Sequence, residues 1–315
     1  MNTLRSQFDR FLVHKRTVGY AYLREELFLR ELGRFACSRH AAILSEALVR
    51  DYLSRWSEAS RPHRLTVVRG VAQFLAVDEP RTFIPPPRFL GIRRRRPVVR
   101  VFLREEASRF LAACDLLPEV CAYPAGLVYS IALRTLLLTG LRRGELLALR
   151  DEDVDLCEAV LTIRRGKFGK SRFVPITPDL VQRLRVYLVA VSRAIAPLRP
   201  ASAFFPRPQG HQPIACKTLY RSFRRTLELA GIRHLGRGQG PRLHDLRHSF
   251  AVFRLLRWYE TGADLRVKLP MLATYLGHIG LTSSQVYLHL TEDFASELTR
   301  RQLHRFGDLI TEVVP

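Results

Sequence analysis

A proline-rich, arginine-bearing segment near residue 90 limits what this chain can fold into. Residues 80–100 contain five prolines, and neither a helix nor a central strand continues through such a segment. A chain of 315 residues has the usual length for two domains. We therefore expect an N-terminal unit over residues 1–90, a linker over 80–100 and a C-terminal unit over 101–315.

The same segment carries a run of four arginines, which an extended linker could lay along a DNA phosphate backbone. The run consists of Arg93, Arg94, Arg95 and Arg96. A solvated linker and a nuclear localisation patch are the alternatives. We treat the run as a candidate DNA contact.

The charge of the chain indicates a polyanionic partner. There are 51 Lys+Arg against 29 Asp+Glu, a formal net charge of +22, and each DNA phosphate that is neutralised releases condensed counterions. A generic basic surface or anionic lipid would also fit this charge, but no apolar run is long enough to cross a bilayer.

Five cysteines without zinc-type spacing indicate free thiols in a reducing compartment. We expect double-stranded DNA as the partner, no membrane, and a cytoplasmic protein that joins the nucleoid when it binds DNA.

Apolar residues at helical spacing over about residues 20–77 predict a helical N-terminal unit. Basic residues are scattered over this unit, and most basic helical faces are merely solvated. The charge of the rest of the chain favours DNA contact here, with Arg64 and Arg69 as candidates.

The C-terminal unit is expected to combine helices with a small β-sheet, so the whole fold is mainly α with a small β-sheet (α+β). A nearly all-apolar run over residues 127–138 predicts a core helix, and apolar runs at 160–163 and 173–176 predict a β-hairpin with a glycine-bearing turn. Further helices are expected at about residues 178–191, 216–230, 243–260 and 270–276.

Two short motifs contain arginines that could hold a phosphate. Arg142 lies in Thr-Gly-Leu-Arg-Arg-Gly-Glu-Leu (139–146), and Arg247 lies three positions after His244, so His244 and Arg247 project from one face of a helix. The planar guanidinium binds phosphate bidentately and stays charged, whereas histidine titrates near neutral pH and can move a proton. Taken singly, each arginine would more often form a surface ion pair, and a lone His-x-x-Arg arises easily by chance. His248 is expected to point elsewhere and to be structural.

A tyrosine follows the third motif. Leu276-Gly277-His278 is followed nine residues later by Tyr287. Cleaving a phosphodiester without a metal requires positive charge on the non-bridging oxygens, a nucleophile and a proton for the leaving oxygen. With an ordinary pKa of about 10, a tyrosine hydroxyl needs the arginines and a nearby base to attack at neutral pH. The alternative is a buried core tyrosine.

In their order along the chain, these motifs resemble the tyrosine recombinase (phage integrase) family. The matching residues are Arg142 with Glu145, Lys167 on the hairpin, His244 with Arg247, Leu276-Gly277-His278, and Tyr287. The resemblance implies a two-domain tyrosine recombinase, with an N-terminal helical core-binding domain and a C-terminal catalytic domain.

The resemblance also implies a role for each matching residue. Tyr287 would attack the scissile phosphate and form a 3′-phosphotyrosyl bond, and Lys167 would protonate the leaving oxygen, with Lys170 at the same hairpin tip as the alternative. The transition state would be stabilised by Arg142, Arg247 and His278. His244 would assist proton transfer, and Glu145 would orient the arginine neighbourhood.

Because the covalent linkage conserves the energy of the broken bond, the resemblance implies no metal, no ATP and no small-molecule cofactor. A cluster of acidic residues is expected to cap a helix-to-strand turn instead of binding a metal. The cluster consists of Asp151, Glu152, Asp153 and Asp155.

As a member of this family the chain would act as a homo-tetramer on paired recombination sites and would integrate, excise or transpose a mobile element. A tail helix over 293–313 would dock on a neighbouring protomer or pack within its own chain. A type IB topoisomerase-like enzyme and a catalytically inactive DNA-binding accessory protein are the alternatives.

Overall fold

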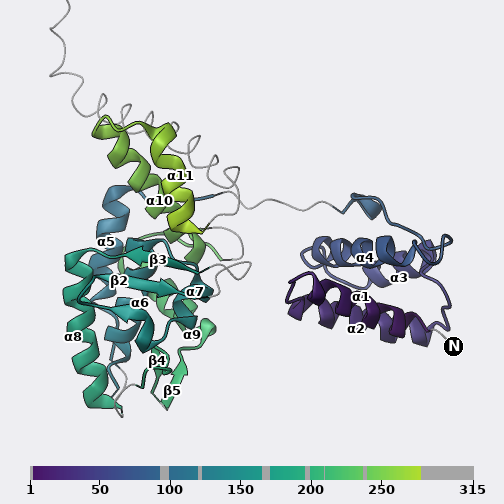
Figure 1. The fold of residues 1–315 in the computed structure, drawn as a ribbon, viewed down its shortest axis with the longest axis horizontal. Coiled ribbons are helices and arrows are strands. Elements are labelled where there is room, and N and C mark those ends of the chain that lie inside the picture. The colour runs from purple at the N-terminus through teal and green to yellow at the C-terminus, as the bar shows by residue number, and fades with distance from the viewer. Residues whose placement is uncertain are drawn as a thin grey trace, which may run out of the picture. The chain divides into compact units, whose positions relative to one another are not determined.

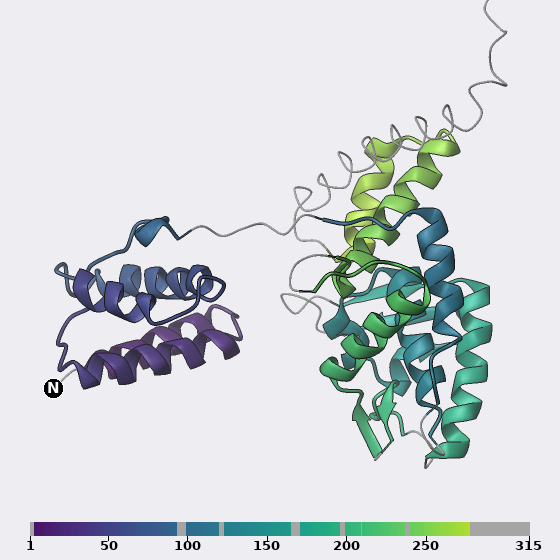
Figure 2. The ribbon, with the colours of Figure 1, turned by 180° about the vertical axis from the view of Figure 1, so that it is seen from behind.

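The computed structural model describes residues 3–92, 99–119, 123–164, 171–195, 199–208, 210–236 and 240–277. Internal contacts divide the chain into two compact units, Met1–Pro97 and Val98–Pro315. Figures 1 and 2 show the two units from opposite sides. Each unit has its own apolar core.

The N-terminal unit is a bundle in which α1 and α2 form one layer against α3 and α4 (Figure 1). Its helices are α1 (Leu4–Thr17), α2 (Leu23–Ser38), α3 (Glu46–Ser54) and α4 (Arg61–Leu75). The sequence pattern placed the first helix near residue 20, and α1 corrects this. Its buried residues, Leu4, Phe8, Phe11 and Leu12, have the spacing of one helical face and pack in the core.

Part of the proline-rich segment belongs to this unit. A short 3-10 helix, η1 (Phe89–Gly91), follows the prolines, and Phe89 and Ile92 are buried in the same core as α1–α4. The backbone N–H of Phe83 donates to the carbonyl of Leu44 at 2.8 Å. Of the expected linker, residues 80–92 are therefore packed against the N-terminal bundle.

The C-terminal unit is built around α6, the nearly all-apolar helix that the sequence predicted. The helices are α5 (Arg104–Cys114), α6 (Ala125–Thr139), α7 (Arg143–Ala148), α8 (Pro178–Ala194), α9 (Cys216–Leu229), α10 (Leu243–Glu260) and α11 (Leu265–Leu276). α6 packs against α5, α7, α8, α9 and α10. α10 and α11 lie side by side at one end of this unit (Figures 1 and 2).

Two small antiparallel sheets complete this unit. The first contains β1 (Val154–Asp155), β2 (Val160–Ile163) and β3 (Arg172–Pro175), and the second contains β4 (Pro206–Arg207) and β5 (Gly210–Pro213). β2 and β3 pair with Leu161 opposite Val174 and Ile163 opposite Arg172, which is the expected hairpin. The described fold is mostly helical with small sheets, as predicted, although the β4–β5 sheet was not anticipated.

The start of α11 differs from the prediction. Pro270 was expected to begin this helix, yet it lies inside it, and α11 begins after Asp264, whose side chain accepts from the N–H of Arg266 at 2.8 Å. Leu269, Leu272 and Leu276 are buried in one cluster with α10. Burial of this face offsets the hydrogen bond that proline cannot donate.

Across the described ranges, no helix is both long and apolar enough to span a membrane.

Candidate active site

The turn between α6 and α7 presents Arg142. Gly140 ends α6 with a left-handed backbone, φ +64°, and a Cβ at this position would lie 2.6 Å from Cδ1 of Phe250. Glycine therefore permits both the turn and the close approach of α10. α7 begins directly after Arg142, whose backbone N–H donates to Oε2 of Glu145 at 2.9 Å. This capping bond fixes Arg142 relative to Glu145.

Glu145 is a buried carboxylate shared by two arginines. Its side chain is 7% exposed. Arg142 Nη1 donates to Oε1 at 2.8 Å, while Arg172 donates from Nη1 to Oε1 at 3.0 Å and from Nη2 to Oε2 at 2.8 Å. Burial alone would raise the pKa of Glu145, but the hydrogen bonds from Arg172 and Arg142 outweigh it and hold that pKa at about 2. Glu145 is therefore ionised and able to orient both guanidinium groups.

Arg247 lies deep in the unit, on α10, and is 1% exposed. Its Nη1 donates to the carbonyl of Gly140 at 2.7 Å, and its Nη2 donates to the carbonyl of Leu276 at 2.6 Å. These carbonyls end α6 and α11, where the helix dipoles favour a cation. Arg247 thus joins the motif around Arg142 to the motif that precedes His278.

The C-terminal end of α11 is where the arginines converge. The carbonyl of Leu276 accepts from Arg247 and, at 3.3 Å, from Arg142 Nη1. The carbonyl of Gly277 accepts from Arg142 Nη2 at 3.0 Å. The carbonyl of Tyr275 accepts from Arg172 Nε at 2.7 Å. Motifs from three separate parts of the sequence therefore form one positively charged site.

Arg172 was missed by the sequence reasoning. It lies at the start of β3, on the same strand face as Val174, which is fully buried. A strand alternates its side chains between two faces, so an arginine two positions before an inward-facing valine was the available signal.

His244 shares the electrostatic field of the arginines. Desolvation within the site, followed by the charge of Arg247, lowers the pKa of His244, and Arg142 contributes in the same direction. His244, Arg142 and Arg247 are thus electrostatically coupled. A neutral imidazole beside two guanidinium groups can accept a proton without adding a third positive charge.

His248 does not point elsewhere, which corrects the expectation. Four residues separate it from His244 on α10, and the two rings pack edge to face with centroids 4.7 Å apart. Burial, the His244 ring and the charges of Arg242 and Arg247 lower the pKa of His248 to about 4, against the opposing effect of Asp245. His248 is therefore held neutral beside the proposed proton carrier.

We expect this histidine to make stability depend on pH. Because the folded-state pKa of His248 is about 4 and the ordinary value is 6.5, the unfolded state takes up the proton first as pH falls. The contribution of neutral His248 to the unfolding free energy is therefore complete above about pH 6.5 and is lost as the pH falls toward 4. Urea unfolding should show a steeper loss of the unfolding free energy between pH 6.5 and 4.5 in the wild type than in His248→Gln. The control His14→Gln, at an exposed position of α1, should keep the wild-type slope, and equal slopes for all three proteins would contradict the prediction.

Several expected site residues lie outside the described ranges. They are Lys167, Lys170, His278, Tyr287, the run Arg93–Arg96 and the tail over 293–313. Gly277 is the last described residue before His278, and Arg164 and Ser171 flank the segment that contains both lysines.

Arg64 is not a DNA contact, which corrects a second expectation. It is 4% exposed, and its Nη1 donates to Glu31 at 2.5 Å and to the hydroxyl of Tyr52 at 2.6 Å. Its guanidinium carbon lies 3.3 Å from the centroid of the Trp56 ring. A guanidinium enclosed in this way holds α2, α3 and α4 together and cannot reach a phosphate.

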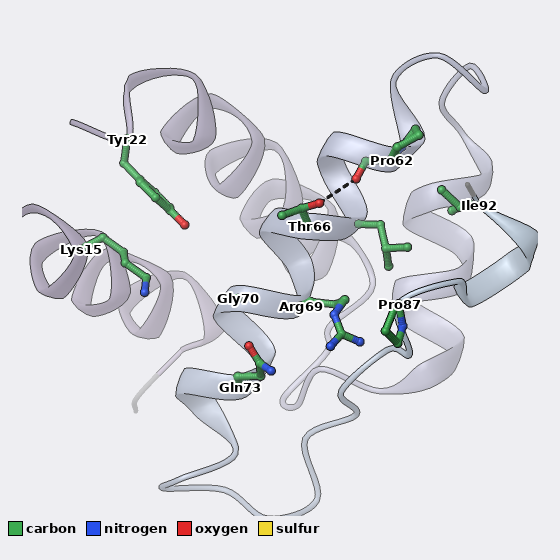
Figure 3. Close-up of a pocket in the computed structure, with 10 residues that line it drawn as sticks. Lys15, Tyr22, Pro62, Thr66, Arg69, Gly70, Gln73, Pro87 and Ile92 are labelled. Atoms are coloured by element: carbon green, nitrogen blue, oxygen red, sulfur yellow. Dashed lines mark hydrogen bonds between the residues drawn. The ribbon is translucent and has the colours of Figure 1, made fainter. Parts of the chain in front are cut away.

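Arg69, the other candidate on α4, lines a pocket of about 380 Å³ in the N-terminal unit (Figure 3). Lys15 lies across this pocket on α1, and Thr66 and Gln73 lie on the same helix as Arg69. Arg69 also donates to the carbonyl of Pro85, which fixes its side chain against the proline-rich segment. The pocket presents two cations and, with Tyr22, three hydrogen-bonding side chains, a combination suited to an anionic, polar ligand.

Two residues of the acidic cluster after α7, Asp153 and Asp155, cap turns as expected. Asp153 Oδ2 accepts from the N–H of Arg150 at 3.0 Å, and Asp155 Oδ1 accepts from the N–H groups of Cys157 and Glu158, both at 2.9 Å. Within the described ranges, no group of three histidine, cysteine, aspartate or glutamate side chains is arranged to hold a metal.

The chain is similar to known recombinases over most of its length. Residues 100–293 match the model of the phage integrase family. A putative integrase/recombinase, y4rB, of Sinorhizobium fredii (strain NBRC 101917 / NGR234) is 33% identical, covering 98% of this chain and 99% of the relative. The tyrosine recombinase XerD of Caulobacter vibrioides (strain ATCC 19089 / CIP 103742 / CB 15) is 30% identical, covering 83% of this chain and 81% of the relative.

A solved structure has a similar fold. The XerH site-specific recombinase bound to palindromic difH substrate, a post-cleavage complex, matches with a TM-score of 0.62 and 19% identity. The match covers 94% of this chain and 95% of that one. At this level of identity the likeness concerns the fold.

Proposed function

This chain belongs to the phage integrase family of tyrosine recombinases, and from that premise we propose that it cleaves and rejoins duplex DNA through a 3′-phosphotyrosyl intermediate. The observation that carries the proposal is the convergence of Arg142 and Arg247 at the end of α11, directly before His278. Each guanidinium has five N–H donors in a fixed fork, so both can hold a phosphate while they contact the helix end.

In the proposed reaction, the hydroxyl oxygen of Tyr287 attacks the scissile phosphorus, and the bond from phosphorus to the 5′ oxygen breaks. The tyrosine proton passes to His244, and Lys167 gives a proton to the leaving 5′ oxygen. Arg142, Arg247 and His278 offset the charge that develops on the non-bridging oxygens. The 5′ hydroxyl of a partner strand then reverses these steps, so a strand is rejoined without an external energy source.

The N-terminal unit is proposed as a core-binding domain that closes on the duplex with the catalytic unit. Lys15 and Arg69 would contact backbone phosphates, and Arg93–Arg96 would follow the phosphate backbone. XerH, a site-specific recombinase with a similar fold, was solved bound to palindromic difH substrate. We further propose a homo-tetramer on paired sites and a role in moving a mobile element.

A covalent-trapping experiment tests the proposed chemistry. Binding sites are first isolated from the DNA that flanks the gene, and end-labelled duplexes carrying a nick near the expected scissile phosphate are incubated with the protein. A protein–DNA adduct that resists denaturing detergent and disappears with protease is the expected result. Tight binding without any adduct would favour the inactive accessory protein instead. Relaxation of supercoiled plasmids that lack the site, without strand exchange, would favour the topoisomerase-like alternative.

A further inference from the structure

Arg172 lies where three parts of the candidate site meet. It begins β3, it contacts Glu145 on α7, and it contacts the last turn of α11; the three elements are neighbours in Figure 1. It also lies five residues after Lys167, at the foot of the hairpin that carries this lysine. No other described side chain donates both to Glu145 and to the carbonyl of Tyr275.

The contacts of Arg172 fix its orientation. Its fork donates to both oxygens of Glu145 at 3.0 and 2.8 Å, and its Nε donates to the Tyr275 carbonyl at 2.7 Å. The side chain is 11% exposed. Bidentate pairing with a carboxylate restricts both the distance and the plane of the guanidinium.

Gly277 provides the space that Arg172 occupies. Gly277 has φ +66°, and a Cβ at this position would lie 2.9 Å from Nη1 and 3.2 Å from Cζ of Arg172. Glycine at position 277 is therefore needed both for the backbone turn and for the space that the Arg172 guanidinium occupies. The guanidinium of Arg172 thus packs directly against the backbone that leads to His278.

We propose that Arg172 is a positioning residue for DNA cleavage, acting on Arg142 through Glu145 and through the end of α11, which both arginines contact. This inference rests on the proposed function. Arg172 fixes the plane of the Glu145 carboxylate, and the carboxylate in turn fixes Arg142 Nη1. A misplacement of about 1 Å at a reacting group costs about a hundredfold in rate. All three guanidinium nitrogens of Arg172 donate to these partners, whereas Arg142 is bonded through Nη1 and Nη2 only, so we place Arg172 as a support for Arg142 and not as a phosphate ligand.

Arg172→Lys tests this role, because lysine keeps the charge and loses the fork. The adduct-forming rate is measured in single turnover over a range of DNA concentrations, so that the limiting rate and the affinity are obtained separately. We expect the limiting rate to fall by about tenfold to a hundredfold with unchanged DNA affinity. Arg164→Lys is the matched control, since Arg164 pairs with Asp153 at the other end of the same hairpin segment and should keep the wild-type rate.

A double-mutant cycle separates positioning from a general loss of stability. If Arg172 acts through Arg142, then Arg142→Lys combined with Arg172→Lys should be about as slow as Arg142→Lys alone. Fully additive losses, or a limiting rate of Arg172→Lys within twofold of the wild type, would overturn the inference. Circular dichroism checks folding, and Arg172→Gln, which leaves no unpaired buried cation, replaces the lysine variant if that variant does not fold. Absence of adduct with the wild type would instead count against the proposed function.

Discussion

Tyr287→Phe is expected to abolish the covalent protein–DNA adduct while leaving DNA affinity unchanged. The substitution removes one oxygen atom, which is the proposed nucleophile, and leaves the arginines and the basic surface in place. Loss of a nucleophile in a preorganised site lowers the rate by at least about a thousandfold. The adduct is measured on a denaturing gel, and affinity is measured by the mobility of the native complex on the same labelled duplex.

Tyr275→Phe provides the matched control. Its hydroxyl lies 3.4 Å from the carbonyl of Pro175, its ring stacks on Phe250, and burial raises the pKa of Tyr275 to about 12. A half-buried phenol with a raised pKa is a poor nucleophile, so this variant should still form the adduct. An adduct with Tyr287→Phe that disappears in Tyr275→Phe would reassign the nucleophile.

Local patterns were sufficient for most elements of the C-terminal unit. The periodicity over residues 243–260 coincides with α10, and the apolar runs around the lysines form the β2–β3 hairpin. In each of these segments one hydrophobic pattern dominates, and the tertiary packing favours the same secondary structure as that pattern. Pro270 is the opposite case, because the local signal for a helix start competes with burial of Leu269, Leu272 and Leu276, and the packing wins.

The site residues that belong to a sequence motif could be predicted, whereas those whose partners are set only by tertiary packing could not. Arg142, Glu145, His244 and Arg247 were identified from motifs. The structure brings Arg142 and Arg247 to the end of α11, with Glu145 bound to Arg142 and His244 in the electrostatic field of both arginines. Arg172 and Arg64 show the limit of this reasoning. Both are arginines in basic segments, but one is bound to a buried carboxylate and the other is enclosed by aromatic rings. Which partner a guanidinium meets depends on contacts across 27 and 33 residues, and no local spacing encodes them.

Arg247 has two roles in this structure, and they can be measured separately. It donates to the carbonyls that end α6 and α11, so it contributes to stability before any DNA is bound. By proposal, it also stabilises the phosphate during cleavage. Arg247→Ala would leave the buried carbonyl of Gly140 without this donor, at about 1–3 kcal/mol, whereas the carbonyl of Leu276 keeps its bond from Arg142. Removal of a charged donor from the transition state costs a further factor of about 10²–10³ in rate.

We therefore expect Arg247→Ala to lower the melting temperature of the C-terminal unit by roughly 6–12 °C. This shift corresponds to a loss of about 3 kcal/mol of unfolding free energy for a unit of this size. We expect the same variant to lower the cleavage rate by at least about a hundredfold. Arg247→Lys should recover part of the melting temperature, because an ammonium can still donate to a helix end, but little of the rate, because it lacks the bidentate fork. Arg257→Ala, at an exposed position of the same helix, should change neither quantity. A lysine variant that regains both stability and rate would contradict the need for a bidentate guanidinium at this position.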